Sequence, residues 1–263
     1  MKHVYIHIPF CKNICSYCDF CKMYHLPKFT ENYFEALKKE VEDSYMDELI
    51  STIYIGGGTP SCLTNEELDK LFNIVSIFKK STDCEFTFEC NPEDITEELI
   101  TYLIKNGINR LSIGVESFNK ENLEFMERKM DYKDLEEKLN MIRTKGINNI
   151  NLDLIYALPN ESLDTLKKDV KKLLKLNPEH ISTYSLIIEE DTKLKLNNTS
   201  YIDEELDAKM YDYICETPVV LREIIENRKE ITKEFVEYFK DKNIEQIYVL
   251  GSGTSYHAGL SAK

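Results

Sequence analysis

Three cysteines stand close together near the start of the chain, in the segment Cys11-Lys12-Asn13-Ile14-Cys15-Ser16-Tyr17-Cys18. Their spacings are CxxxC and CxxC, shortly after the apolar run Val4–Ile8. Thiolates this close in sequence converge on one soft metal centre when the backbone curls around it. Cys11, Cys15 and Cys18 would hold three corners of a four-iron cluster and leave one iron open. A structural zinc site and free thiols are the alternative interpretations.

The composition limits the class of protein. The chain has 263 residues, 42% of them hydrophobic, which suffices for one large domain or for one domain and a fragment of another. A formal net charge of −14 argues against a nucleic-acid partner, because phosphates would repel it. We find no membrane-spanning run and no signal peptide, so we expect a cytoplasmic protein without an integral membrane segment. Its eight cysteines are then expected to be reduced or metal-bound rather than in disulfides.

Strand and helix patterns alternate along the chain without a hairpin signal, which predicts a parallel α/β sheet. The predicted strands are Val4–Ile8, Ser51–Ile55, Glu85–Glu89, Arg110–Val115, Ile150–Ile155 and His180–Ile187. The predicted helices are Thr30–Tyr45 with Thr30 as its cap, Asn65–Lys80, Glu97–Lys105, Asn122–Glu127, Lys133–Arg143 and Leu163–Leu176. Six strand–helix units are too few for an eight-stranded barrel, so the expected fold is an open, partial barrel.

The motif CxxxCxYC resembles the signature of the radical S-adenosylmethionine (SAM) enzymes, and the resemblance implies a partial (β/α)6 barrel. It also implies a [4Fe-4S] cluster whose open iron is chelated by SAM. The run Gly56-Gly57-Gly58-Thr59-Pro60 after the second strand supports it, although it would by itself be an ordinary turn. In the family this segment binds the amino group of SAM.

Several polar residues are candidates for contacts with SAM. Asp153 lies in the apolar run Leu152–Ile155, where a carboxylate is costly unless it is paired or bound to a ligand. Glu89 ends a strand similarly, whereas an isolated charged residue is more often a solvated charge or a salt bridge. By the resemblance, the positions that contact SAM are Tyr5, Tyr17, Gly57, Gly58, Thr59, Glu89, Arg128 and Asp153. Glu116, which follows the fourth strand, is a further candidate.

Residues 1–215 resemble one subfamily, the oxygen-independent coproporphyrinogen III oxidases and the HemW-type haem chaperones. The similar segments are Tyr5–Cys11, Gly56–Ser61, Glu89–Pro92, Arg110–Val115 and Asp153–Pro159. There are two departures from the family pattern. Glu116 replaces a glutamine, so that an acceptor-only carboxylate stands where an amide is usual. Ala157 replaces the glycine of DLIYGLP.

One position separates the chaperones from the oxidases. The oxidases carry a further cysteine two residues after the last cluster cysteine, and Phe20 stands there in this chain. The resemblance therefore favours a haem chaperone, which would bind haem or a porphyrin, serve a haem-accepting protein and need an electron donor for its cluster. The alternative is the oxidase, a radical decarboxylase. Cys21 is one residue out of register, and we expect a structural role for His7.

The subfamily pattern ends near Cys215. The predicted strand Gln246–Leu250 and the loop Gly251–Gly259 resemble the start of a sugar isomerase (SIS) domain, whose glycines and hydroxyls bind a phosphate. A single strand of such a domain cannot pair its edges. We therefore predict two parts, residues 1–215 and an SIS-like fragment over residues 216–263. A further alternative function is binding of a sugar phosphate by this tail.

Overall fold

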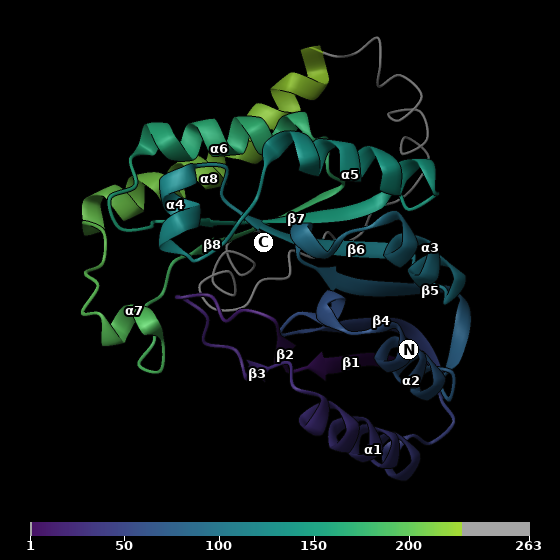
Figure 1. Ribbon diagram of the computed structural model, residues 1–263. Coiled ribbons are helices and arrows are strands. Elements are labelled where there is room, and N and C mark those ends of the chain that lie inside the picture. The colour runs from purple at the N-terminus through teal and green to yellow at the C-terminus, as the bar shows by residue number, and fades with distance from the viewer. Residues whose placement is uncertain (1, 228–263) are drawn as a thin grey trace.

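A single curved sheet of six parallel strands forms the centre of the computed structural model, which describes residues 2–227 (Figure 1). The strand order follows the chain: β1 (Lys2–Ile8), β4 (Leu49–Gly57), β5 (Lys79–Cys90), β6 (Arg110–Glu116), β7 (Asn149–Tyr156) and β8 (His180–Ser185). Every neighbouring pair is parallel, as the crossover helices require. The predicted α/β class and the open six-stranded barrel are confirmed.

Helices follow the strands and surround the outside of the sheet (Figure 1). They are α1 (Pro27–Ser44), α2 (Asn65–Val75), α3 (Glu97–Lys105), α4 (Lys120–Phe125), α5 (Tyr132–Thr144), α6 (Leu163–Lys175), α7 (Lys193–Leu196) and α8 (Glu204–Asn227). The core between the two layers contains fully buried strand side chains such as Ile53, Phe88 and Leu111. Burying one such side chain contributes roughly 1.5–3 kcal/mol, so this apolar layer is what stabilises the barrel.

Two predicted helix boundaries are wrong by three residues or more, and the helix predicted over Asn122–Glu127 is observed two residues earlier as α4. Thr30 is not the cap of α1, which begins at Pro27, because proline suits the first turn of a helix. The helix predicted to reach Lys80 ends at Val75, and Lys79 and Lys80 pair with β4 as the start of β5. The lysines continue the helical spacing, but sheet pairing determines their conformation.

Several elements were not predicted. A short parallel pair, β2 (Phe10–Cys11) and β3 (Met23–Tyr24), closes the cysteine loop. The helix α8 runs through residues 215–217, where we predicted the boundary between the two parts of the chain. The predicted SIS-like strand and phosphate loop, residues 246–259, lie outside the described residues. Within residues 2–227, no helix is long and apolar enough to span a membrane.

Candidate cluster and SAM site

The predicted site residues come together at the carboxyl edge of the sheet. The cysteine loop follows β1, Gly57 ends β4, Glu89 lies next to the end of β5, and Glu116 ends β6. Asp153 lies inside β7 and pairs with Gly114 of β6. Loops at this edge carry the functional groups of α/β barrels. The sheet thus brings residues as far apart in the chain as Cys11 and Asp153 to one side of the molecule.

The cysteine loop is anchored at both of its ends. The N–H of Met23 donates to the carbonyl of Pro9 (2.7 Å), and that of His25 donates to the carbonyl of Cys11 (2.9 Å). The His25 ring contacts the Glu67 carboxylate at 2.8 Å, which connects the returning arm to the start of α2. In the middle of the loop, the Ser16 hydroxyl donates to the carbonyl of Phe125 (2.8 Å) beside α4. The loop is therefore held in place by the barrel on which it rests.

The three thiols lie close enough to influence one another. Burial raises the pKa of Cys11, the Thr59 hydroxyl lowers it, and the neighbouring charges of Cys18 and Cys15 raise it again. Burial also raises the pKa of Cys18, with a smaller contribution from Cys15. Two hydrogen-bond donors reach the sulfurs: Thr59 Oγ1 lies 3.4 Å from Cys11 Sγ, and Arg128 Nη1 lies 3.8 Å from Cys15 Sγ. Three clustered thiols with cationic and hydroxyl donors suit a bound anionic iron–sulfur cluster.

A single metal ion fits these side chains less well. Among the described residues, no three His, Cys, Asp or Glu side chains converge on a point that one ion would occupy. A four-iron cluster binds each thiolate to a different iron, so its ligands do not need a common point. The donor set Cys11, Cys15 and Cys18 is thus chemically suited to the cluster.

Each glycine of the run is in close contact with a neighbouring residue, which leaves no room for a side chain. A Cβ atom on Gly58 would lie 2.8 Å from the Phe10 carbonyl oxygen and 3.0 Å from Cys11 Sγ. A Cβ on Gly57 would lie 2.6 Å from the His7 ring, and the residue has a φ of +117°, which favours glycine. These contacts explain the glycines without a ligand, and they also bring the Thr59 hydroxyl to Cys11.

Three buried carboxylates, Glu89, Glu116 and Asp153, lie close enough to interact, and Glu89 contacts the glycine run. Glu89 accepts hydrogen bonds from the Tyr54 hydroxyl (2.6 Å) and from the Gly57 N–H (2.9 Å). Burial nevertheless raises the pKa of Glu89. Burial, together with the charges of Glu116 and Glu89, raises the pKa of Asp153 to about 7. Asp153 is therefore poised between its neutral and charged forms near neutral pH.

Glu116 is the most buried of the three carboxylates, and burial raises its pKa while Arg128 lowers it. Tyr17 of the cysteine loop lies close to Glu116 and lowers the pKa of that carboxyl further. Burial, followed by the charge of Glu116, raises the pKa of Tyr17 well above its usual value. The backbone of Glu116 is left-handed (φ 67°), an unfavourable conformation that often marks functional positions.

Tyr5 and His7 lie on β1, at the edge of the sheet. The Tyr5 hydroxyl contacts His7 Nδ1 at 3.1 Å, and His7 Nε2 contacts the Cys21 carbonyl oxygen at 2.7 Å. Since both ring nitrogens of His7 are engaged within the chain, its contacts agree with the expected structural role. Tyr5 and Cys21 are exposed.

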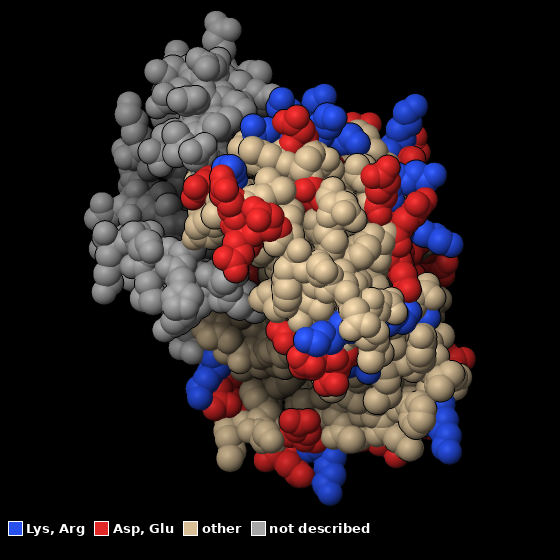
Figure 2. All heavy atoms as spheres, turned by 90° about the vertical axis from the view of Figure 1, so that its left-hand side faces the viewer, with Lys and Arg blue, Asp and Glu red and all other residues tan. Residues whose placement is uncertain are grey.

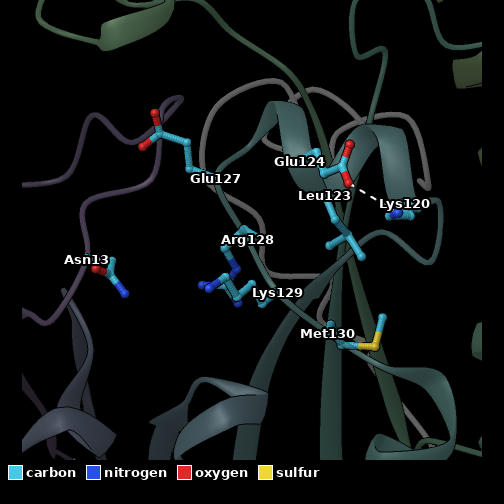
Figure 3. Close-up of a pocket in the computed structure, with 8 residues that line it drawn as sticks. All are labelled: Asn13, Lys120, Leu123, Glu124, Glu127, Arg128, Lys129 and Met130. Carbon is cyan, nitrogen blue, oxygen red and sulfur yellow. Dashed lines mark ion pairs between the residues drawn. The ribbon is translucent and has the colours of Figure 1, made fainter.

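A pocket of about 580 Å³ opens beside the cysteine loop (Figure 3). Arg128 is the predicted site residue that lines it, and its side chain points toward Asn13 of the cysteine loop in this view. The lining residues are Asn13, Lys120, Leu123, Glu124, Glu127, Arg128, Lys129 and Met130. Figure 2 looks onto this end of the molecule, where uncharged side chains cover a broad central area and charged groups lie around it. The pocket therefore gives access to one border of the site.

The sequence did not predict a group of connected polar residues that joins the cysteine loop to the ends of β4 and β5. They are Lys12, Ser61, Asn91 and Asp94, which are connected by hydrogen bonds and an ion pair. Tyr54, which donates to Glu89, was also missed. The signal in the sequence was weak: Asn91 directly follows a strand, and both Asn91 and Ser61 lie within the similar segments.

A family model, the Radical SAM superfamily, matches residues 5–173. The chain belongs to the Radical SAM superfamily. Membership implies a [4Fe-4S] cluster and SAM as cofactors, and Cys11, Cys15 and Cys18 are the residues suited to hold the cluster. When bound, these cofactors would supply radical chemistry, while the protein supplies orientation and exclusion of water.

Individual relatives refine the family. The "Heme chaperone HemW" of Lactococcus lactis is 35% identical over 98% of this chain and 70% of that protein. HemW of Bacillus subtilis is 37% identical over 81% of this chain and 59% of that protein. The solved structure of coproporphyrinogen III oxidase from Escherichia coli, a radical SAM enzyme, superposes with a TM-score of 0.75 at 27% identity. That match covers 84% of this chain and 52% of the oxidase.

This chain thus spans between about half and 70% of the length of these relatives. The alignment with the Lactococcus protein extends past residue 215, where we predicted the subfamily pattern to end. None of these matches supports an SIS domain.

Proposed function

We propose that this chain acts as a HemW-type haem chaperone, with a [4Fe-4S] cluster on Cys11, Cys15 and Cys18. The observation that carries the cofactor part is the group of three interacting buried carboxylates, Glu89, Glu116 and Asp153, of which Glu116 lies beside Tyr17 of the cysteine loop. SAM has a cationic sulfonium and a cationic ammonium group, which would offset carboxylates that are otherwise costly to bury. Tyr5, Tyr17, Gly57, Gly58, Thr59 and Arg128 complete the proposed SAM contacts.

The haem part rests on the HemW relatives and on Phe20. Phe20 is 60% exposed and stands where the oxidases carry a further cysteine. Residues 23–29, which follow the cysteine loop, carry four additional large apolar side chains that are exposed: Met23, Tyr24, Leu26 and Phe29. Exposed apolar groups on this scale are typical of interaction surfaces, and a porphyrin or a haem-accepting protein would cover them.

Electron paramagnetic resonance (EPR) tests the cofactor part. Protein reconstituted with iron and sulfide without oxygen and reduced with dithionite should show a four-iron signal that shifts when SAM is added. The Cys15→Ala variant should lose that signal. A wild-type signal that is indifferent to SAM would count against the open iron.

Haem binding and oxidase activity need separate assays. Titration with haem, followed by absorbance, should saturate at one haem per chain, and the haem should then pass to an acceptor apoprotein. The likeness to the Escherichia coli oxidase makes decarboxylation of coproporphyrinogen the second candidate. Turnover of coproporphyrinogen without oxygen would favour it over the chaperone. Sugar-phosphate binding by residues 216–263 stays a prediction from sequence, and saturable binding of glucosamine-6-phosphate would support it.

A further inference from the structure

Asn91 belongs to the group of connected polar residues that also contains Lys12, Ser61 and Asp94. It follows β5 directly and stands at the N-cap of the short 3-10 helix η2 (Pro92–Asp94). Asparagine at this position commonly caps a helix with its side chain, but here the side chain makes no capping hydrogen bond. It points instead toward residues that contact the cysteines.

Both polar atoms of the Asn91 side chain are used. Its Oδ1 accepts a hydrogen bond from Arg128 Nη1 (2.8 Å), and its Nδ2 donates to Thr59 Oγ1 (3.5 Å). The same Arg128 nitrogen lies 3.8 Å from Cys15 Sγ, and the Thr59 hydroxyl donates to Cys11 Sγ at 3.4 Å. Asn91 is therefore connected to Cys15 through Arg128 and to Cys11 through Thr59, with one side chain between Asn91 and each cysteine.

The direction of each hydrogen bond determines how Asn91 orients the donors that face the cysteines. A threonine hydroxyl has one proton, and its oxygen accepts the N–H of Asn91. The hydroxyl proton is consequently directed at Cys11. Arg128 is held from the other side as well, because its Nη2 donates to the Gly114 carbonyl. Fixed between Gly114 and Asn91, the guanidinium presents an N–H to Cys15.

The backbone of Asn91 connects to the cysteine loop by a third path. Its N–H donates to Ser61 Oγ (3.0 Å), and that hydroxyl donates to Asp94 Oδ2 (2.9 Å). The other oxygen of Asp94 pairs with Lys12 Nζ at 2.7 Å, although the lysine itself is largely exposed. Lys12 is the residue after Cys11, so this path fixes the cysteine loop without a contact to a thiol.

We propose that Asn91 is a positioning residue that directs hydrogen bonds from Thr59 and Arg128 onto two cluster thiolates and thereby raises the reduction potential of the cluster. Donors aimed at thiolate sulfurs stabilise the extra negative charge of the reduced cluster, which makes reduction easier. This inference rests on the proposed cluster, and it adds a residue that does not itself touch the cluster or SAM.

The test compares Asn91→Ala with Asn109→Ala. The Asn109 side chain also accepts one hydrogen bond and donates one, to the backbone of β5, but it precedes β6 at the opposite end of the sheet. Each reconstituted protein is titrated with dithionite at defined potentials while the EPR signal is recorded. Iron content and urea unfolding are measured on the same samples. Thr59→Val, which removes only the hydroxyl between Asn91 and Cys11, gives a second measurement if Asn91→Ala does not fold.

We expect Asn91→Ala and Thr59→Val to shift the midpoint to more negative potential. The ratio of reduced to oxidised cluster at a fixed potential should fall on the order of tenfold, which is 59 mV for a one-electron couple. Asn109→Ala should leave the midpoint unchanged even where it lowers stability. A wild-type midpoint in both Asn91→Ala and Thr59→Val, or an equal shift in Asn109→Ala, would overturn the inference while leaving the cluster in place. Wild-type protein without a cluster would instead overturn the proposed function and this inference with it.

Discussion

Replacing Asp153 by asparagine should stabilise the cluster-free protein, and the gain should depend on pH. Burial, Glu116 and Glu89 raise the pKa of Asp153 from 3.8 to about 7. The folded state therefore keeps a proton that the unfolded state has released, and stability falls as pH rises between these two values. A difference of about three pKa units corresponds to about 4 kcal/mol, which is the upper limit of the gain above pH 7.

Asparagine at position 153 can keep the hydrogen bonds of Asp153, so the substitution chiefly removes the ionisable group. Asn151 Nδ2 donates to Asp153 Oδ1 (2.7 Å), and Ser112 Oγ donates to Oδ2 (3.4 Å). The amide oxygen of an asparagine can still accept from Asn151, while its N–H₂ group can donate to Ser112, whose hydroxyl also accepts. The exchange leaves no cavity, and the hydrogen bond between Ser112 and residue 153 is kept with its donor and acceptor reversed.

Urea unfolding of both proteins at several pH values gives the assay. The difference in unfolding free energy should grow by about 1.4 kcal/mol for each pH unit between about pH 4 and pH 7 and stay constant above that. The same Asp153→Asn variant should bind SAM more weakly at pH 8, as measured by calorimetry on the reconstituted protein. A stability difference that is independent of pH, or a net loss of stability at pH 8, would refute the reasoning.

Two further substitutions test the backbone of the site. Gly58→Ala should lower the unfolding free energy by roughly 1–3 kcal/mol and reduce the iron bound after reconstitution, since its Cβ would crowd the Ile8 and Phe10 carbonyls and Cys11 Sγ; a fully loaded, equally stable variant would contradict this. Ala157→Gly should raise the unfolding free energy by up to about 1 kcal/mol, because Ala157 has a φ of 60° and glycine adopts this conformation without strain. Thermal unfolding checks the second expectation, and a lower midpoint for Ala157→Gly would contradict it.

Periodicity was sufficient to predict the barrel because each element carries its own local signal. The helix α3, Glu97–Lys105, was predicted at its observed ends, and a Thr96 side chain caps it. The start of β5 could not be predicted, because Lys79 to Asp83 are polar and largely exposed. Lys79 and Lys80 become strand because they pair with Leu49 and Ile50 of β4, which is a tertiary contact.

The site was predictable only where a residue type was unusual for its place in the sequence. The clustered cysteines, the triple glycine and the carboxylate in an apolar strand all stood out. Asn91, Ser61 and Asp94 did not, because a polar residue in a loop is ordinary. Their importance depends on which side chains the barrel places next to them, such as Arg128, and sequence spacing does not contain that information.

The two residues that differ from the pattern of the similar subfamily, Glu116 and Ala157, share a backbone conformation. Glu116 and Ala157 both have left-handed backbones, and they lie where the neighbouring strands β6 and β7 end. Both residues are expected to make this edge of the barrel less stable. Ala157 adopts a left-handed backbone less readily than glycine, and Glu116 buries an ionisable carboxyl where a glutamine would bury a neutral amide. A cationic ligand on the carboxylates would offset the second cost but not the first. On the proposed function, Glu116 therefore links the stability of the barrel to SAM, whereas Ala157 only weakens the fold.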